Sequence, residues 1–344
     1  MPVTLVEVAA RAGVSPATVS RVLNGNYPVA ESTRQRVEEA VRELDYVVNA
    51  HARALLHATS GIVGVVLNDA SDPFFAGIAR GIQGAAAETS RLSVICNSEG
   101  DPEQEFAFLD LLRGHRADAV ILVGAAPEDE EYRAAAIARA KGLRSSGTRL
   151  VLCGRPAPGD DAPGDVVTID NEGGSIAITR HLVELGHRRI AYVTGPDGRS
   201  TTTARLAGFR AALAEAGLAV DENLVVHGDF SRQAGREAVE RLLAAGHDFT
   251  AVLAANDLVA AGAVSALRAA GRSIPDDVSV AGYDNLPTAV DVWPNLTTVH
   301  VPLEEIGRKA VELAFGPGNA QETTVVTVPT ELVVRDSTAG PATG

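Results

Sequence analysis

Short apolar runs rich in β-branched residues alternate with stretches of helical periodicity from Gly61 to near the C-terminus. The clearest runs are GIVGVVL (61–67), AVILV (119–123), RLVLC (149–153), RIAYVTG (189–195), TAVLAAN (250–256) and VSVAGYD (278–284). This alternation is typical of parallel sheets with helices on both faces. The unit recurs about ten times, more than one open sheet usually holds, so we expect two lobes. The Pro-, Gly- and Asp-rich segment 155–165 is the expected crossing between them.

The first sixty residues follow a different pattern, that of short helices. Thr4 and Glu7 form a capping box that begins one helix, and Gly13 suits the left-handed turn that ends it. Ser15 and Pro16 then begin a second helix. A third helix is expected over about 32–44. The apolar residues expected to face inward are Leu5, Val8, Ala9, Val19, Val22, Leu23, Val37, Ala40, Val41 and Leu44.

These patterns predict an α/β chain with a small all-α helix-turn-helix head and a two-lobed core of parallel sheets. We expect the head over 1–47, a hinge or linker over 48–60 and the core over 61–344. Ligands of open α/β sheets bind beyond the carboxyl ends of the strands, so the cleft between the lobes is the expected binding site.

Charge is distributed unevenly along the chain, whose formal net charge is −14. The first sixty residues hold six arginines and six acidic residues, so the rest of the chain carries all of the net negative charge. Any surface that binds phosphates is therefore expected in the head.

The second helix is predicted to present small polar groups and one guanidinium on its outward face. These residues are Ser15, Thr18, Ser20, Arg21 and Asn24. Hydroxyls, an amide and an arginine suit phosphates and base edges, whereas a merely solvated face usually mixes Glu and Lys. A generic helical hairpin without DNA binding is the alternative.

The linker NAHARALLHATSG (49–61) is apolar enough to require burial, yet no neighbouring segment is predicted to cover it. One reading is an ordinary interdomain helix. The other is a helix that orders only on DNA and inserts a leucine between base steps.

Other classes of protein lack their expected signatures. No apolar run approaches the roughly 20 residues that cross a bilayer, and the N-terminus has no signal-peptide pattern, so we expect a cytoplasmic protein that does not enter a membrane. Cys96 and Cys153 have no metal-ligand spacing. Phosphate-loop, nucleophile-elbow and HExxH motifs do not occur, so we expect no enzyme, cofactor or metal. A periplasmic sugar-binding protein would need an export signal and no head.

The segments VTLVEVAARAGVSPATVSRVLNG (3–25) and PVAESTRQRVEEAVRELDYVVNAHARAL (28–55) resemble the LacI/GalR family of bacterial transcriptional regulators. The similarity continues in order along the chain through HLVELGHRRIAYVTGP (181–196), ARLAGFRAAL (204–213), AVLAANDLVAAGAVSALRAAG (251–271), IPDDVSVAGYDNLP (274–287), LTTVHVP (296–302) and ELVVRDST (331–338). The resemblance implies a periplasmic-binding-protein-like core and a regulator, most often a repressor, whose affinity for DNA an effector controls.

For DNA binding, the resemblance implies that Pro16 and Ala17 tune operator choice and that Arg21 reads a base. The same resemblance assigns phosphate contacts to Ser15, Thr18 and Asn24. In the hinge that begins at Asn49, it implies that Leu55 is a minor-groove wedge, with Ala52 and Arg53 beside it. Two heads of a homodimer would bind a pseudo-palindromic operator and kink its centre.

For the effector, the resemblance implies a site at the strand ends, formed by Asp72, Phe74, Phe75, Arg155, Arg199, Thr201, Arg205, Phe230, Asn256 and Asp284. Aromatic rings can stack on a pyranose or a base, and Arg, Asn and Asp can bind adjacent hydroxyls. A sugar is favoured because of these many hydroxyl partners. A purine or nucleoside corepressor, or a sugar-metabolising enzyme of the same fold, is the alternative. Whether the effector releases DNA or promotes its binding stays open.

The sequence departs from the family pattern at three places. Ala30 replaces the usual capping serine, so the third helix is expected to lose about 1 kcal/mol unless Ser32 caps it. Val48 replaces the usual proline before the hinge. Few residues follow Arg335, so we expect a dimer without the extra helix that makes some relatives tetramers.

Overall fold

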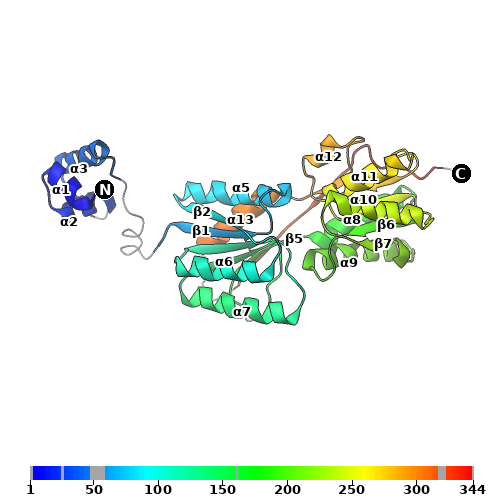
Figure 1. The fold of residues 1–344 in the computed structure, drawn as a ribbon, viewed down its shortest axis with the longest axis horizontal. Helices are drawn as coiled ribbons and strands as arrows, with labels where there is room; N and C mark the ends of the chain where they lie inside the picture. The colour runs from blue at the N-terminus through cyan, green and yellow to red at the C-terminus, as the bar shows by residue number, and fades with distance from the viewer. Residues whose placement is uncertain (1–2, 25–26, 47–58, 160–161, 317–322, 343–344) are drawn as a thin grey trace. The chain divides into compact units, whose positions relative to one another are not determined.

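The computed structural model describes residues 3–24, 27–46, 59–159, 162–316 and 323–342. The chain forms two compact units, residues 1–60 and 61–344, drawn in Figure 1. Each unit is described separately below.

The head contains three helices, α1 (Leu5–Ala12), α2 (Pro16–Asn24) and α3 (Glu31–Glu43). The predicted capping box at Thr4 is confirmed, as is the left-handed C-cap at Gly13, whose φ is 64°. The predicted apolar stripes are also confirmed, because all ten residues lie in or against one small core. Ala30 occupies the N-cap of α3 without a side-chain hydrogen bond, as its methyl group requires.

The first lobe of the core is built on a six-stranded sheet in the order β11-β5-β4-β3-β1-β2, with every pair parallel. Its strands are β1 (Ile62–Leu67), β2 (Leu92–Asn97), β3 (Ala119–Val123), β4 (Arg149–Cys153), β5 (Asp165–Ile169) and β11 (Val325–Val328). Its helices are α5 (Pro73–Glu88), α6 (Pro102–Gly114), α7 (Glu130–Ser145) and α13 (Leu303–Phe315). Helices α5 and α13 cover one face of the sheet, and α6 and α7 cover the other (Figure 1).

The second lobe is built on a four-stranded parallel sheet in the order β7-β6-β8-β9. The strands are β6 (Ile190–Thr194), β7 (Val225–His227), β8 (Ala251–Ala254) and β9 (Ser279–Ala281). Its main helices are α8 (Asn171–Glu184), α9 (Ser200–Glu215), α10 (Arg232–Ala244) and α11 (Asp257–Ala269). The first two pack on one face and the last two on the other. Smaller elements are η1 (Glu222–Leu224), α12 (Thr288–Asp291) and the antiparallel pair β10 (Thr298–His300) and β12 (Glu331–Val333).

The predicted lobe crossing at 155–165 is wrong. This segment joins β4 to β5 within the first sheet, where Val151 pairs with Asp165. The first crossing lies instead at Asp170, between β5 and α8, and the chain crosses twice more, between β10 and α13 and between β11 and β12. Proline and glycine mark a loop, but they do not specify which elements the loop joins.

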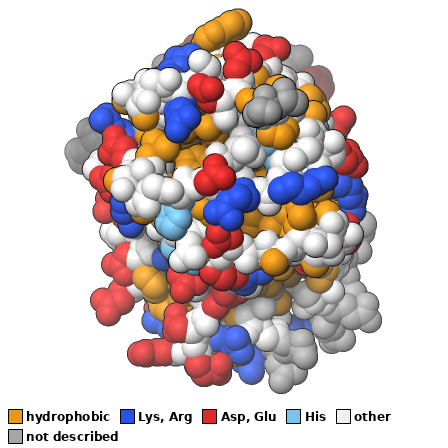
Figure 2. Space-filling model, turned by 90° about the vertical axis from the view of Figure 1, so that its right-hand side faces the viewer, with side chains coloured by type: hydrophobic (Ala, Val, Ile, Leu, Met, Phe, Trp, Pro, Cys, Tyr) orange, Lys and Arg blue, Asp and Glu red, His pale blue; other side chains and the backbone are white. Residues whose placement is uncertain are grey.

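The surface of the core mixes charges of both signs on the face shown in Figure 2, where acidic and basic side chains are interspersed among apolar ones. No helix among the described residues is both long enough and apolar enough to span a bilayer.

Candidate functional site

Helix α2 displays the predicted polar face of the head. Ser15, Pro16, Ala17 and Arg21 are exposed, Thr18 and Ser20 are half-buried, and Val19 between them is buried in the head core. The Ser15 hydroxyl accepts the Thr18 amide hydrogen at 3.2 Å, which caps the helix as predicted. The face therefore combines hydroxyls with one guanidinium at the start of the helix that follows the turn. Asn24 lies at the end of α2, and the predicted hinge residues Asn49, Ala52, Arg53 and Leu55 lie outside the described residues.

Arg21 has an aromatic partner that the sequence reasoning missed. Its guanidinium lies 5.3 Å from the centre of the Tyr27 ring, and both side chains are exposed. A cation–π contact restricts the guanidinium without occupying its N–H donors. The arginine is thus pre-oriented and still able to bind a base or a phosphate.

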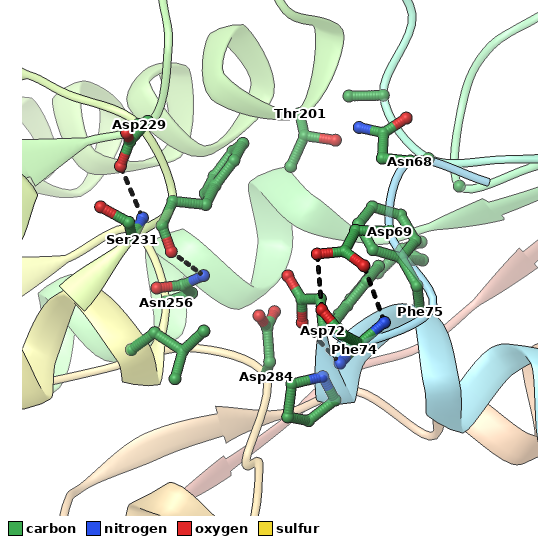
Figure 3. A pocket seen from close by; sticks show the side chains of 18 of the residues that line it. Asn68, Asp69, Asp72, Phe74, Phe75, Thr201, Asp229, Ser231, Asn256 and Asp284 are labelled. Carbon is green, nitrogen blue, oxygen red and sulfur yellow. Dashed lines mark hydrogen bonds between the residues drawn. The ribbon is translucent and has the colours of Figure 1, made fainter. Parts of the chain in front are cut away.

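A cavity of about 740 Å³ lies between the two lobes of the core. The first lobe contributes residues that follow β1, β2 and β3, and the second contributes residues that follow β7, β8 and β9. Figure 3 shows these side chains converging from both lobes. The cavity therefore lies at the carboxyl ends of the strands, where parallel α/β sheets bind ligands.

Three of the helices that begin at this cavity have polar N-caps that line it. The Asp72 carboxylate accepts the Phe74 amide hydrogen at 2.8 Å at the start of α5. Ser231 caps α10, and Asn256 caps α11 by accepting the Val259 amide hydrogen at 2.8 Å. The Asn256 amide nitrogen also donates to the Phe230 carbonyl at 3.2 Å.

Arg205 is buried beneath the cavity and is held from several directions. Its Nε donates to Asn171 Oδ1 at 2.8 Å and its Nη2 to Asp284 Oδ1 at 3.0 Å, while Nη1 donates to the Ala255 carbonyl. Burial raises the pKa of Asp284, and the neighbouring Arg205 opposes that rise. Asp284 also has a φ of 96°, a strained conformation for a residue with a side chain, and such strain is concentrated at ligand sites.

Aromatic rings form the apolar part of the cavity. Phe74 and Phe75 are half-buried and meet edge to face, with ring centres 5.3 Å apart. A side chain at Gly195 would collide with the Phe230 ring, so this glycine leaves room for the third ring. These rings offer flat apolar surfaces beside the polar groups.

Eight of the ten predicted effector residues line the cavity, namely Asp72, Phe74, Phe75, Thr201, Arg205, Phe230, Asn256 and Asp284. Arg155 does not line it. Gly154 takes a left-handed turn with a φ of 76°, and the buried Arg155 guanidinium binds Glu105 at 3.1 Å, the Tyr132 hydroxyl at 2.6 Å and the Gly124 carbonyl.

Arg199 also lies away from the cavity lining. Its backbone pairs with Pro127 of the first lobe, and its Nη2 donates to the Gly100 carbonyl at 3.4 Å. It therefore joins the two lobes at the rim.

The cavity contains polar residues that the sequence reasoning missed, namely Asn68, Asp69, Ser71, Asn97, Glu99, Asn171, Asp229 and Ser231. Asn68, Asp69 and Ser71 follow the predicted strand at 61–67, so reading on from that strand end would have found them. The other five lie at or after the ends of β2, β5 and β7, strands that were not predicted individually. Among the described residues, no cluster of His, Cys, Asp and Glu side chains is arranged to hold a metal ion.

Two family matches cover most of the chain. Residues 4–49 match the bacterial regulatory proteins of the lacI family, and residues 60–336 match the periplasmic binding proteins and sugar binding domain of the LacI family.

Similar proteins match over nearly their full length. The chain is 37% identical to the HTH-type transcriptional regulator CelR of Thermobifida fusca over 341 residues, which are 97% of this chain and 98% of that protein. The structure of a transcriptional regulator CelR–cellobiose complex is similar with a TM-score of 0.72 and 35% identity, covering 97% of this chain and 99% of that one. The structure of the lac repressor dimer bound to operator and the anti-inducer ONPF is similar with a TM-score of 0.85 and 27% identity, covering 98% of this chain and 100% of that one.

Proposed function

This chain belongs to the lacI family of bacterial regulatory proteins, and we propose that it is a cytoplasmic, homodimeric repressor whose operator affinity a bound sugar controls. It is a sequence-specific DNA-binding transcriptional regulator, and its relatives are regulators rather than enzymes. The observation that carries the proposal is that one chain combines an exposed helix face bearing Arg21 with a cleft lined by carboxylates, amides and aromatic rings.

In the proposed DNA complex, α2 enters the major groove. Arg21 donates two hydrogen bonds to a guanine, the commonest specific contact between a protein and a base. Pro16 and Ala17, at the exposed start of the helix, contact neighbouring base edges, and Ser15 and Thr18 bind phosphates together with Ser20 and Asn24.

The segment 48–60 is proposed as the hinge between the head (1–47) and the effector-binding core (61–344). In this scheme Leu55 inserts into the minor groove at the centre of the operator, with Asn49, Ala52 and Arg53 beside it. Pairing of two hinges requires two chains, so the hinge couples DNA binding to the dimer.

A second copy of the chain is proposed to pack against strand β2. This strand lies at the edge of the first sheet, and it exposes Leu92 (65%), Val94 (36%) and Ile95 (36%). Apolar side chains on an exposed edge strand favour association. A contact there would connect the effector-binding lobes of the two chains with their paired hinges.

A sugar is the proposed effector because the cleft presents carboxylate and amide groups beside three phenylalanine rings. Sugar hydroxyls can donate to the carboxylates, while a pyranose ring packs on an aromatic face. The CelR structure with bound cellobiose supports this ligand class by similarity. A purine is the second candidate, because Phe74, Phe75 and Phe230 could also stack on a base.

The test is operator binding by the full-length protein. DNA selected from a random library should bind with an affinity that falls about a thousandfold between 50 and 200 mM salt, as expected for six or more phosphate contacts. Addition of sugars, and in parallel of purines, should then change that affinity and raise the melting temperature of the protein. Absence of salt-sensitive, sequence-specific binding would refute the proposal.

A further inference from the structure

The lining of the cleft has an excess of negative charge. Five carboxylates line it, those of Asp69, Asp72, Glu99, Asp229 and Asp284, and among the described residues Arg205 is the only lining side chain with a positive charge. Figure 3 shows Asp69, Asp72 and Asp284 gathered in one part of the cleft, and Asp229 comes from the loop that follows β7.

Arg205 does not offset this excess. Its side chain is 4% exposed and forms an ion pair with Asp284 at 3.0 Å. Its remaining contacts include Asn171 and the Ala255 carbonyl. The one guanidinium is therefore already matched by one carboxylate.

The other four carboxylates have no cationic partner among the described residues. Asp69 accepts hydrogen bonds from the Ser71 amide and hydroxyl at 2.8 and 2.7 Å, and Asp229 accepts one from the Ser231 amide at 2.7 Å. Such bonds leave several carboxylate lone pairs open to a ligand. Burial raises the pKa of Asp72, and repulsion from Asp69 raises it further.

Helix N-termini could still attract an anion, because their free amide groups and their dipoles favour negative charge. Five helices begin at this cleft, namely α5, α8, α9, α10 and α11, and four of them already have an acceptor from their own sequence. Asp72 caps α5, Asp170 caps α8, Ser231 caps α10 and Asn256 caps α11. Helix α9 begins after Arg199 without a side-chain cap. The chain has therefore filled with its own side chains four of the five helix starts that could otherwise attract a phosphate.

From this arrangement we infer that the effector cleft selects by charge: it takes an uncharged, hydroxyl-rich saccharide and rejects sugar phosphates and sugar acids of the same skeleton. Hydroxyl groups can donate to the unpaired carboxylates, whereas an anion would be repelled by all four in a partly desolvated site. This inference rests on the proposed function, because it specifies which sugars can act as effector.

The experiment uses matched pairs of probes with the full-length protein. Cellobiose with cellobiose 6′-phosphate, glucose with glucose 6-phosphate, and galactose with galacturonate are compared by thermal shift and by calorimetric titration. We expect every ligand that binds to be neutral, and we expect its charged partner to bind with an affinity at least about a hundredfold lower. A charged partner that binds as tightly as its neutral counterpart would overturn the inference, as would a wider panel of neutral sugars in which none binds. Operator binding, measured on the same preparation, tests the proposed function separately.

Two isosteric variants test whether the named carboxylates cause the discrimination. Asp69→Asn and Asp229→Asn remove one charge each, and the amide oxygen can still accept the local amide hydrogen. Each should narrow the neutral-to-charged affinity ratio about tenfold. Asp248→Asn, which changes an 87% exposed side chain outside the cleft lining, should leave the ratio unchanged. An equal loss of affinity for neutral and charged probes would contradict the inference. The same narrowing of the affinity ratio in Asp248→Asn would also contradict it.

Discussion

The head and the core use arginine in opposite ways. Arg21 lies exposed on α2 beside the Tyr27 ring, whereas Arg205 is 3% exposed and is held by Asp284, Asn171 and a carbonyl. An exposed guanidinium is free to bind a ligand but contributes little to stability. A buried one shapes its site only because other groups of the protein neutralise it. Substitutions in the two regions should therefore have different consequences.

The largest effect is expected from Arg205→Met. This variant leaves the Asp284 carboxylate buried without its cation, a change that typically costs about 3–5 kcal/mol. The melting temperature of the core should fall and sugar binding should be lost. Calorimetric melting of the full chain measures the first effect and titration with sugar the second.

The matched control is Arg80→Met, which breaks the exposed pair with Glu304. Exposed ion pairs contribute at most about 1 kcal/mol to the free energy of unfolding, so this variant should melt close to the parent. If the two variants melted at the same temperature, the buried pair would not have the structural role that its contacts indicate.

Arg21→Ala should leave stability almost unchanged but weaken DNA binding, in contrast to Arg205→Met, which should lower stability. The free energy of unfolding should stay within about 0.5 kcal/mol of the parent, because the side chain is exposed. Affinity for the selected operator should fall about 5- to 150-fold, the effect of about 1–3 kcal/mol from one arginine–guanine contact. Fluorescence anisotropy with operator and with unrelated DNA separates the two kinds of binding.

Arg34→Ala serves as the control in the head, because it removes the same charge from α3 rather than from α2. It should weaken both kinds of DNA binding slightly and equally. An equal loss of specific and non-specific binding in Arg21→Ala would contradict base reading by this residue.

The same contrast explains which parts of the molecule could be predicted from the sequence. The face of α2 consists of residues within one helix, whose caps and period are visible locally, so its members were identified together. The cleft is assembled from segments far apart in the sequence. The rule that ligands bind at strand ends predicted the cleft, and the family resemblance indicated Asp72, Asn256 and Asp284 within it. Neither could tell where a side chain points after the strand.

Arg155 illustrates that limit. It follows β4 in the way that Asn256 follows β8, yet it turns away from the cleft and binds Glu105, 50 positions earlier in the chain. No local pattern signals such a long-range partner. Asp69 and Asp229 were not predicted, because short acidic loops are common on protein surfaces and give no local sign of a binding site. Only the fold brings these two residues to one cavity.

Asp257 gives the core a dependence on pH that the head should not share. Burial, together with the charge of Asp284, raises the pKa of Asp257 to about 7. The folded core therefore binds a proton more readily than the unfolded chain between about pH 4 and pH 7. The contribution of this group to stability is favourable at low pH and is lost as the pH rises through 7.

Asp257→Asn should remove that dependence. Relative to the parent, the variant should gain about 1–2 kcal/mol in the free energy of unfolding between pH 5.5 and pH 8. Urea unfolding at the two pH values measures the gain, with the exposed Asp276→Asn as the control. A difference between variant and parent that does not change with pH would rule out this role for Asp257.

The smallest effect is expected at the rim, where the two lobes touch. The Thr203 hydroxyl donates to Glu128 at 2.6 Å, beside backbone bonds from Glu128 to Gly198 and from Ser200 to Ala126. This hydrogen bond stabilises the observed arrangement of the lobes, and a sugar that binds this arrangement benefits from it. Thr203→Val keeps the shape but removes the hydroxyl, so sugar affinity should fall about two- to fivefold, as for one exposed hydrogen bond. Thr203→Ser should retain the parent affinity, and operator binding without sugar should be the same in all three proteins. If the serine variant bound sugar as weakly as the valine variant, the hydroxyl would not be the cause, and the contact between the lobes would contribute nothing to effector binding.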